Sequence, residues 1–417
     1  MEYFQTLTQI PHCSHKADKL KDFLVTFGKE RGYAVYTDDV DNIMIKKEGA
    51  KLALQAHYDM VCVGRAPKLE TYIKDGWMYA KESTLGADNG MAIAMMMALM
   101  DEGVACEFLF TSDEEVGLIG AEALDFALES PYMLNLDSED EAEVYIGCAG
   151  GVDIKATKRI EKKPCHDNNF YEVTISGLPG GHSGVEIHKN IPNALKLFGE
   201  FCRNKPIMIA SIQGGERINS IPVNLKAIVA CHDRLESQAH IDVKKLKGSF
   251  EVFDGRELVE VLDKFDNGVL TFNDALDIPD TSINLALIMI EDETIMIEAS
   301  ARAMDAEGLE AVKNSATTHF EKYGYKVEHN GKYPAWKPEI NDFSHIVNDA
   351  MKAIFGRSEF KAIHAGLECA ILSQHYPDMK ITSIGPNIRS PHSIHEKVEI
   401  ASVEKIYEVV KRVIEEI

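Results

Sequence analysis

Acidic and histidine side chains end several expected strands in the first third of the chain, and this pattern most constrains the fold. An apolar run over residues 106–111 leads into the motif SDEEVG at 112–117, and a helical pattern follows. Adjacent glutamates at a strand end point in different directions, so Glu115 could bind a metal ion while Glu114 handles a proton. The same cluster also fits an ordinary helix N-terminus, where negative charge is favourable. The residues at the other strand ends therefore decide between a metal site and an ordinary helix N-terminus.

Those other strand ends carry side chains of the same kind. A strand over residues 51–56 runs into His57, and Asp59 follows on the same face, where its carboxylate could hold the imidazole for a metal ion. A plain polar strand end would look the same. Asp88 lies among small residues that let a metal ion approach closely, and Asp137 closes the next apolar strand.

Strands that alternate with helices predict an α/β fold with a mainly parallel or mixed sheet. We expect helices over residues 16–32, 91–102 and 120–128, from the spacing of their apolar residues. The many methionines of the second helix are explained by core packing. In open sheets of this kind the functional site lies beyond the carboxyl ends of the strands.

The chain is long enough for two domains. Its 417 residues exceed the usual size of one hydrophobic core. Composition turns charged and polar around residue 164, and a proline-containing stretch at 333–338 looks like a return linker. We therefore expect one domain from residues 1–165 and 336–417, which carries the strand-end acids, and an inserted α/β domain over 166–335.

Charge and cysteine usage narrow the partners and the compartment. Lysine and arginine number 44 against 67 aspartates and glutamates, a net charge of -23, so nucleic acid and anionic membranes are poor partners. The eight cysteines show no CxxC spacing and no disulfide-like clustering, which predicts reduced thiols. Without a secretion signal pattern or an apolar run of membrane-spanning length, we expect a cytoplasmic protein that acts on small molecules.

The strand-end side chains and a late histidine form a set that suits metal chemistry. Histidine and carboxylate ligands fit two divalent ions that share a carboxylate, with zinc favoured and manganese or cobalt as alternatives. Such a pair can activate a water molecule and polarise a carbonyl group. Glu114, beside the ligand Glu115, would then take the proton of the water and deliver it to a leaving amine.

Seven motifs together resemble the M20 metallopeptidases, and within them the PepD group of aminoacyl-histidine (cytosol non-specific) dipeptidases. They are HYDMV at 57–61, ADNG at 87–90, SDEEVGLIGA at 112–121, NLDSEDEAEVYIGCAGG at 135–151, PGGHSG at 179–184, HAGLE at 364–368 and PHSIHE at 391–396. The resemblance runs along nearly the whole chain. It implies a zinc-peptidase-like, three-layer catalytic domain with an inserted α/β lid domain, and it leaves open a homodimer through that lid.

The resemblance also implies a complete ligand set. His57 and Asp137 would hold one metal ion, Glu115 and His392 the other, and Asp88 would bridge them. The late histidine is selected by the family's pattern, which places an acid four residues further on, here Glu396. His395 is then expected to lie behind the ligands or at the surface.

Three further features follow from the resemblance in the same domain. Asp59 would orient His57, and Glu114 would be the catalytic base. The peptide bond between Asp88 and Asn89 would be cis.

Residues outside the ligand set are expected to contact the substrate. His182 resembles the lid histidine that hydrogen-bonds the oxyanion, although a histidine flanked by glycines also fits an ordinary loop. Asn219 looks like a lid residue that contacts substrate. Arg302 is a candidate for binding the substrate carboxylate, with a structural salt bridge as the alternative. His364 and Glu368 lie on a substrate-side loop by resemblance.

The expected activity is metal-dependent hydrolysis of dipeptides, with a preference for Xaa-His substrates implied only by the group's name. N-acyl-amino-acid deacylation and tripeptide aminopeptidase activity on the same scaffold are alternatives. A non-catalytic metal-binding protein is a more distant one, and Glu114 and His182 argue against it because a structural metal site needs neither.

Overall fold

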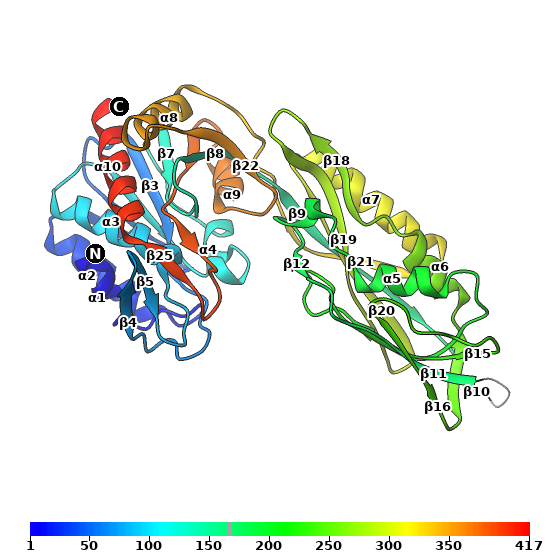
Figure 1. The fold of residues 1–417 in the computed structure, drawn as a ribbon. Helices are drawn as coiled ribbons and strands as arrows, with labels where there is room; N and C mark the ends of the chain where they lie inside the picture. The colour runs from blue at the N-terminus through cyan, green and yellow to red at the C-terminus, as the bar shows by residue number, and fades with distance from the viewer. Residues whose placement is uncertain (166–168) are drawn as a thin grey trace. The chain divides into compact units, whose positions relative to one another are not determined.

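The computed structural model describes residues 1–165 and 169–417, which form two compact units (Figure 1). Unit 1 comprises Met1–Cys148, Trp336–Ala362 and Leu367–Ile417. Unit 2 comprises Ala149–Ala335 and Ile363–Gly366. The chain therefore leaves unit 1 and returns to it, as expected for an inserted domain.

The first boundary between the units lies earlier in the chain than the sequence analysis placed it. Strand β9 (Gly150–Arg159) falls before residue 165, yet it pairs along its whole length with β20 (Thr294–Ala303) of unit 2. Because these backbone hydrogen bonds belong to one sheet, the change of unit comes at Cys148 rather than at the polar stretch that follows β9.

Unit 1 is built on an eight-stranded mixed sheet. The strands, in order across the sheet, are β1 (Ala34–Thr37), β2 (Ile43–Lys46), β6 (Glu107–Thr111), β3 (Leu52–His57), β7 (Tyr132–Asn135), β23 (Lys380–Ser383), β8 (Glu143–Cys148) and β22 (Glu359–Ile363). The central strands β6, β3, β7 and β23 are parallel. Antiparallel pairs join β1 to β2, β2 to β6, and β8 to β23. Strands β3 and β6 are buried along their whole length, as central parallel strands are.

Helices cover both faces of this sheet and complete the three layers. One set of helices shares a hydrophobic core with alternate strand residues such as Leu54 and Phe108. This set is α1 (Glu2–Leu7), α2 (Asp18–Glu30), α3 (Ala87–Asp101), α8 (Asp342–Phe355) and α10 (Ile400–Glu416). On the other face α9 (Glu368–His375) packs against β23, β8 and α4 (Ile119–Glu122). The predicted fold class of this domain is thus confirmed.

One expected helix is much shorter in the structure. The sequence pattern predicted a helix over residues 120–128, but α4 ends at Glu122. Further on, the buried carboxylate of Glu107 accepts hydrogen bonds from the backbone N–H groups of Glu129 and Ser130. Because the Glu107 side chain accepts these backbone hydrogen bonds, the residues before β7 need no helix to pair them.

A four-stranded sheet and a short 3-10 helix complete unit 1. The sheet consists of β24 (Ile388–Arg389), β25 (Lys397–Glu399), β5 (Trp77–Ala80) and β4 (Thr71–Lys74). The 3-10 helix spans Glu114–Val116 directly after β6.

Unit 2 is an eleven-stranded antiparallel sheet with helices packed on its apolar side. The main strands in order are β16 (Ile241–Leu246), β11 (Asn169–Ile175), β15 (Leu225–Cys231), β13 (Met208–Gly214), β19 (Ile278–Glu291), β20, β9 and β21 (Lys326–Tyr333). The others are β10 (Lys163–Cys165), β17 (Phe250–Asp254) and β18 (Gly268–Asn273). The helices are α5 (Ala194–Cys202), α6 (Arg256–Lys264) and α7 (Ala306–Lys322). A separate ribbon pairs β12 (Gly181–His182) with β14 (Ser220–Ile221).

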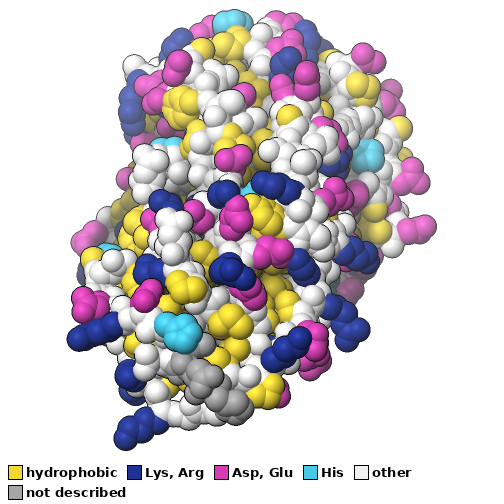
Figure 2. Space-filling model, turned by 90° about the vertical axis from the view of Figure 1, so that its right-hand side faces the viewer, with side chains coloured by type: hydrophobic (Ala, Val, Ile, Leu, Met, Phe, Trp, Pro, Cys, Tyr) yellow, Lys and Arg dark blue, Asp and Glu magenta, His cyan; other side chains and the backbone are white. Residues whose placement is uncertain are grey.

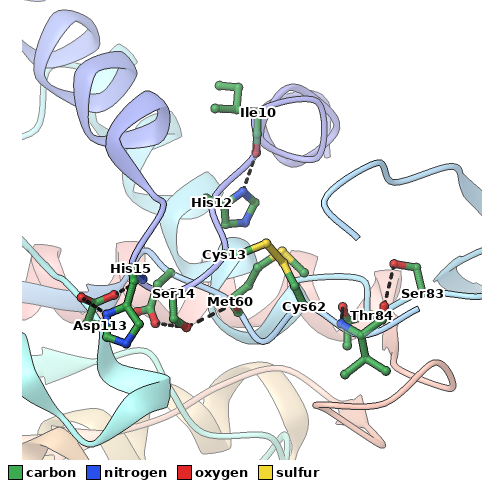
Figure 3. Close-up of a disulfide and its surroundings, with 12 residues drawn as sticks. Ile10, His12, Cys13, Ser14, His15, Met60, Cys62, Ser83, Thr84 and Asp113 are labelled. Atoms are coloured by element: carbon green, nitrogen blue, oxygen red, sulfur yellow. Dashed lines mark hydrogen bonds and ion pairs between the residues drawn. A yellow bond between two sulfur atoms is a disulfide. The ribbon is translucent and has the colours of Figure 1, made fainter. Parts of the chain in front are cut away.

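Cys13 and Cys62 form a disulfide bond, so the expectation that the thiols are reduced is wrong for this pair (Figure 3). The two cysteines are 49 residues apart in the chain, and their Cα atoms are 5.6 Å apart. The fold creates this proximity, because the segment after α1 runs beside the end of β3, with a backbone bridge between Cys13 and Met60. Linear spacing could not reveal it.

The surface carries charges of both signs. On the face shown in Figure 2, acidic and basic side chains are interspersed, with apolar side chains between them. Within the described ranges, the helices include none with the length and apolar character needed to span a bilayer.

Candidate active site

The carboxyl ends of the parallel strands bring the five predicted metal ligands together. His57 ends β3, Glu115 follows β6, and Asp137 follows β7. Asp88 lies at the start of α3, and His392 lies in the connection between β24 and β25. The ligand atoms of His57, Asp88 and Asp137 lie within 4.8 Å of one another, and so do those of Asp88, Glu115 and His392.

Asp88 stands between two imidazole rings. Its Oδ1 atom is 3.1 Å from Nε2 of His57, and its Oδ2 atom is 3.1 Å from Nε2 of His392. Nε2 of His57 is also 3.4 Å from Oδ1 of Asp137, and Nε2 of His392 is 2.9 Å from Oε2 of Glu115. A carboxylate that presents one oxygen to each half of the cluster has the arrangement of a bridging ligand.

The donor set fits a pair of divalent cations. Oε1 of Glu115 is buried and accepts no hydrogen bond from the described residues. Buried polar atoms are nearly always paired, so this oxygen points to a missing partner of positive charge. Two imidazole nitrogens and three carboxylates are ligands that suit zinc and related ions.

The electrostatic surroundings favour proton transfer at Glu114. Burial, reinforced by the neighbouring carboxylates of Asp137 and Glu115, raises the pKa of Glu114 well above its usual value despite the opposing charge of His57. Burial likewise raises the pKa of Asp137 to about 6. Negative groups concentrated at one point in this way are characteristic of sites that bind cations and move protons.

Asp59 connects the end of β3 to the loop that carries Glu114. Nδ1 of His57 is 3.0 Å from the backbone oxygen of Asp59 and 3.5 Å from its carboxylate, which leaves Nε2 for a metal ion. The carboxylate also accepts hydrogen bonds from the backbone N–H groups of Glu114 and Glu115, at 2.9 and 3.4 Å. The hydroxyl of Ser14 donates to it at 2.7 Å.

Glu396 anchors the loop that presents Asp88, a role that sequence reasoning did not assign. Its buried carboxylate accepts backbone N–H hydrogen bonds from four consecutive residues, Leu85, Gly86, Ala87 and Asp88, at 2.7, 3.2, 2.8 and 3.4 Å. Burial raises the pKa of Glu396 to about 7. The spacing of Glu396 from His392 was the available signal, but only the fold shows which backbone it binds.

Two smaller expectations concern the same part of unit 1. The peptide bond between Asp88 and Asn89 is cis, as the resemblance implied. His395 is exposed, in keeping with a place outside the ligand set.

His182 and Asn219 lie side by side in unit 2. The backbone N–H groups of Gly184 and Val185 both donate to Nδ1 of His182, at 3.1 Å each. In the neutral ring the proton is therefore on Nε2, which makes that atom a hydrogen-bond donor. Strands β12 and β14 pair here, and the N–H of Ser183 donates to the backbone oxygen of Asn219 at 2.9 Å. Asn219 itself is exposed.

Arg302 and His364 are buried beside the same loop of unit 2. Nη1 of Arg302 donates to the hydroxyl of Tyr333 at 2.6 Å, and its Nε has no hydrogen-bond partner among the described residues. Nε2 of His364 is 2.7 Å from the hydroxyl of Ser282, and burial lowers the pKa of His364 to about 3. A Cβ atom on Gly184 would lie 2.4 Å from the backbone oxygen of His364. Only glycine therefore lets the loop approach so closely.

Glu368 lies in the interior of unit 1. Its Oε2 atom accepts hydrogen bonds from Gln55 at 2.6 Å and from Thr111 at 2.7 Å. Burial raises the pKa of Glu368 to about 7. Since Gln55 lies on β3 and Thr111 on β6, Glu368 links the ends of these two strands.

A dinuclear ligand set with an adjacent glutamate, at the carboxyl edge of a mixed sheet, defines the site of a metal-dependent hydrolase. The chain belongs to peptidase family M20/M25/M40, which its sequence matches over residues 53–416. The resemblance drawn from the motifs is thereby confirmed, and the protein is an enzyme that hydrolyses peptide bonds.

Similar proteins span the whole chain. The cytosol non-specific dipeptidase of Escherichia coli (strain K12) is 31% identical over 100% of this chain and 97% of its own. The crystal structure of aminoacylhistidine dipeptidase from Vibrio alginolyticus matches with a TM-score of 0.85 and 30% identity, over 100% of this chain and 96% of that one. The aminopeptidase PepT from Bacillus cereus ATCC 10987 shares the fold, with a TM-score of 0.61 and 18% identity over 100% and 97%.

Proposed function

We propose that this protein is a di-metal dipeptidase that cleaves short, unblocked peptides. The observation that carries the proposal is Asp88, whose two carboxylate oxygens face His57 and His392, with Glu114 beside the same cluster. The dipeptidase names of the two full-length relatives support the substrate class. From the same names we also propose a preference for Xaa-His peptides and a location in the cytoplasm for this chain.

The proposed ligands divide between two ions. His57 and Asp137 would hold one, Glu115 and His392 the other, and Asp88 both. Zinc is proposed because the set mixes imidazole nitrogen with carboxylate oxygen, and manganese or cobalt could take its place. When bound, the ions would polarise the substrate carbonyl and lower the pKa of a water molecule.

Glu114 is the proposed base and then the acid of the reaction. Its carboxylate would take a proton from the attacking water and deliver it to the amine as the peptide bond breaks. A pKa raised by burial and by neighbouring acids suits both steps, because the group must gain the proton and later release it. Asp59 would act through position, by holding His57 and the backbone of Glu114 at once.

Unit 2 is the proposed lid, and its polar loop would bind the substrate. The Nε2 proton of His182 would stabilise the oxyanion of the tetrahedral intermediate. Asn219 beside it would contact the peptide. Arg302, whose Nε has no partner among the described residues, would bind the terminal carboxylate of the substrate. The neutral His364 would lie beside that carboxylate. A homodimer through unit 2 is part of the same proposal.

Removal of metal should abolish activity, and a substrate panel should define its class. We expect protein treated with a chelator to hydrolyse nothing and protein reloaded with Zn²⁺ to recover dipeptide hydrolysis. Tripeptides and N-acyl amino acids should be cleaved at least about tenfold more slowly, because the proposed substrates are dipeptides with both ends unblocked. Release of amino acids would be followed by chromatography.

The same panel separates the alternatives. Faster release from N-acyl amino acids or tripeptides would replace the dipeptidase proposal by one of those activities on the same scaffold. Binding of two metal ions without hydrolysis of any member would leave only a metal-binding role.

Replacing Gly184 by alanine should impair catalysis while unit 1 stays intact. The added methyl group would meet the backbone oxygen of His364 at 2.4 Å and Nε of Arg302 at 3.1 Å, so the His182 loop must shift. A displacement of this size should lower kcat/KM by about 10²-fold. The matched control is Val185→Ala, because Val185 lies on the same loop and is exposed, and its backbone N–H would still donate to His182. Equal activity of the two variants would contradict the proposed role of this loop.

A further inference from the structure

The disulfide between Cys13 and Cys62 lies near Ser14, His15 and Asp113 (Figure 3), which are close in the chain or in space to the proposed catalytic residues. Cys62 follows Asp59 by three residues, and Cys13 directly precedes Ser14, whose hydroxyl donates to the Asp59 carboxylate. The bond therefore joins the segment His12–His15, here called the N-terminal brace, to the loop that leaves β3.

The N-terminal brace contacts both loops that carry catalytic residues. On one side, the backbone of Met60 exchanges hydrogen bonds with His12 and Ser14, at 3.0 and 3.3 Å. On the other side, the N–H of His15 donates to the Asp113 carboxylate at 2.6 Å, and the His15 ring lies 3.0 Å from it. Asp113 directly precedes Glu114. The brace thus spans from the His57 loop to the base.

The Ser14 hydroxyl donates a third hydrogen bond to the Asp59 carboxylate. Asp59 is buried, and its oxygens already accept from the backbone N–H groups of Glu114 and Glu115. Those two bonds fix where the 3-10 helix begins, and Ser14 fixes the carboxylate that accepts them. A shift of Ser14 would be passed through Asp59 to the Glu114 backbone.

We propose that the N-terminal brace is a positioning element for Asp59 and Glu114, and that the Cys13–Cys62 disulfide locks it, so that reduction of this bond slows catalysis. The inference rests on the proposed role of Glu114 as the base. Ser14 is a positioning residue here, since it acts on the reaction only through Asp59.

Reduction should loosen the brace without unfolding unit 1. Helices α1 and α2, which flank the brace, place Phe4, Leu7, Leu20 and Leu24 in the hydrophobic core. Between them the brace is held by a few hydrogen bonds and by the buried ring of His12, and its contact through the exposed His15 ring is weak. Once the covalent link is removed, local opening of the brace becomes easier while both ends stay anchored.

The chemistry of the switch is an ordinary two-electron reduction. Both sulfur atoms are in half-buried residues, so a small reductant can reach the bond. With a phosphine, the S–S bond of the protein breaks, each cysteine sulfur gains a proton from water, and the phosphine takes the water oxygen to become a phosphine oxide. Cys106, Cys148, Cys202, Cys231 and Cys369 are buried in the structure and stay outside this exchange.

The test compares oxidised protein, protein reduced with a phosphine, and the variant C13S/C62S. A phosphine is used so that no added thiol competes for the metal ions. We expect reduction and the double substitution to lower kcat about tenfold, with KM and metal content nearly unchanged. C13S/C62S should not respond to the phosphine. Hydrogen exchange of peptides over residues 56–63 and 111–117 should be faster in both forms than in the oxidised protein.

Ser14 variants separate positioning from general stability. In the oxidised protein, Ser14→Ala should lower kcat about tenfold, and Ser14→Thr, which keeps a hydroxyl, should restore most of it. Equal kcat and equal exchange in the oxidised and reduced proteins would overturn the inference. The variant Glu114→Gln tests the underlying function separately. If E114Q were active, Glu114 would not be the base, whether the disulfide is oxidised or reduced.

Discussion

Replacing Glu114 by glutamine is expected to lower kcat for dipeptide hydrolysis by about 10³-fold, while the protein still binds two metal ions. The amide has nearly the shape of the carboxyl group but cannot accept the proton of the attacking water. The change also leaves the backbone N–H of residue 114 free to donate to Asp59, as it does now at 2.9 Å. Steady-state kinetics and metal analysis by mass spectrometry on the same preparation would measure both quantities.

The matched control for this variant is Glu122→Gln. Glu122 lies on α4, a few residues further along the same connection, and its side chain is exposed. This change removes the same charge from the same region and should leave kcat within about twofold of the unsubstituted protein, because exposed sites away from the reacting atoms contribute little. If E114Q retained a rate close to that of E122Q, proton transfer by Glu114 would be refuted.

The strand-end ligands were predictable from sequence for a simple geometric reason. Carboxyl ends of parallel strands meet at one edge of a sheet, so His57, Glu115 and Asp137 could be placed together once their strands were recognised. Asp88 was grouped with the strand ends but lies at the start of α3, and the choice of His392 came from resemblance to a family. In the structure all five belong to two overlapping groups whose possible ligand atoms lie within 4.8 Å of one another.

The contacts that could not be predicted from sequence join residues that are far apart in the chain. Glu396 reaches the backbone of residues 85–88 across roughly three hundred positions, and no periodicity marks such a contact. The disulfide of Cys13 and Cys62 is of the same kind, since it needs β3 to end beside the segment after α1. Glu368, which was expected on a substrate-side loop, accepts hydrogen bonds from Gln55 of β3 and Thr111 of β6, and no sequence pattern indicated these contacts.

These long-range contacts share one function, which is to hold the strand-end loops. Glu396 fixes the loop of Asp88, Asp59 fixes that of Glu114, and Glu368 joins the ends of β3 and β6. Because loops are the least constrained parts of a sheet fold, a precise cluster of candidate ligands needs support from hydrogen bonds of this kind.

Replacing Asp88 by asparagine should remove metal from the site and with it nearly all activity. Each oxygen of Asp88 now faces a different imidazole, at 3.1 Å on both sides. An asparagine keeps one carbonyl oxygen and turns an amide N–H₂ group toward the other half, where it would repel a cation. We expect at most one tightly held ion in place of two, Zn²⁺ affinity weaker by at least about 10²-fold, and kcat/KM lower by at least about 10³-fold.

The effect should come from the bridging position rather than from the loss of a charge, and Asp140→Asn tests this. Asp140 lies three residues beyond Asp137, and its side chain is exposed and pairs with Arg389. This variant loses the same charge near the same site and should bind two ions with unchanged affinity. Calorimetric titration of the chelated proteins with Zn²⁺ would give the stoichiometry and Kd of each. Two ions bound to D88N as tightly as to D140N would show that Asp88 does not bridge the metals, and the ligand assignment would have to be redrawn around Glu115 and Asp137.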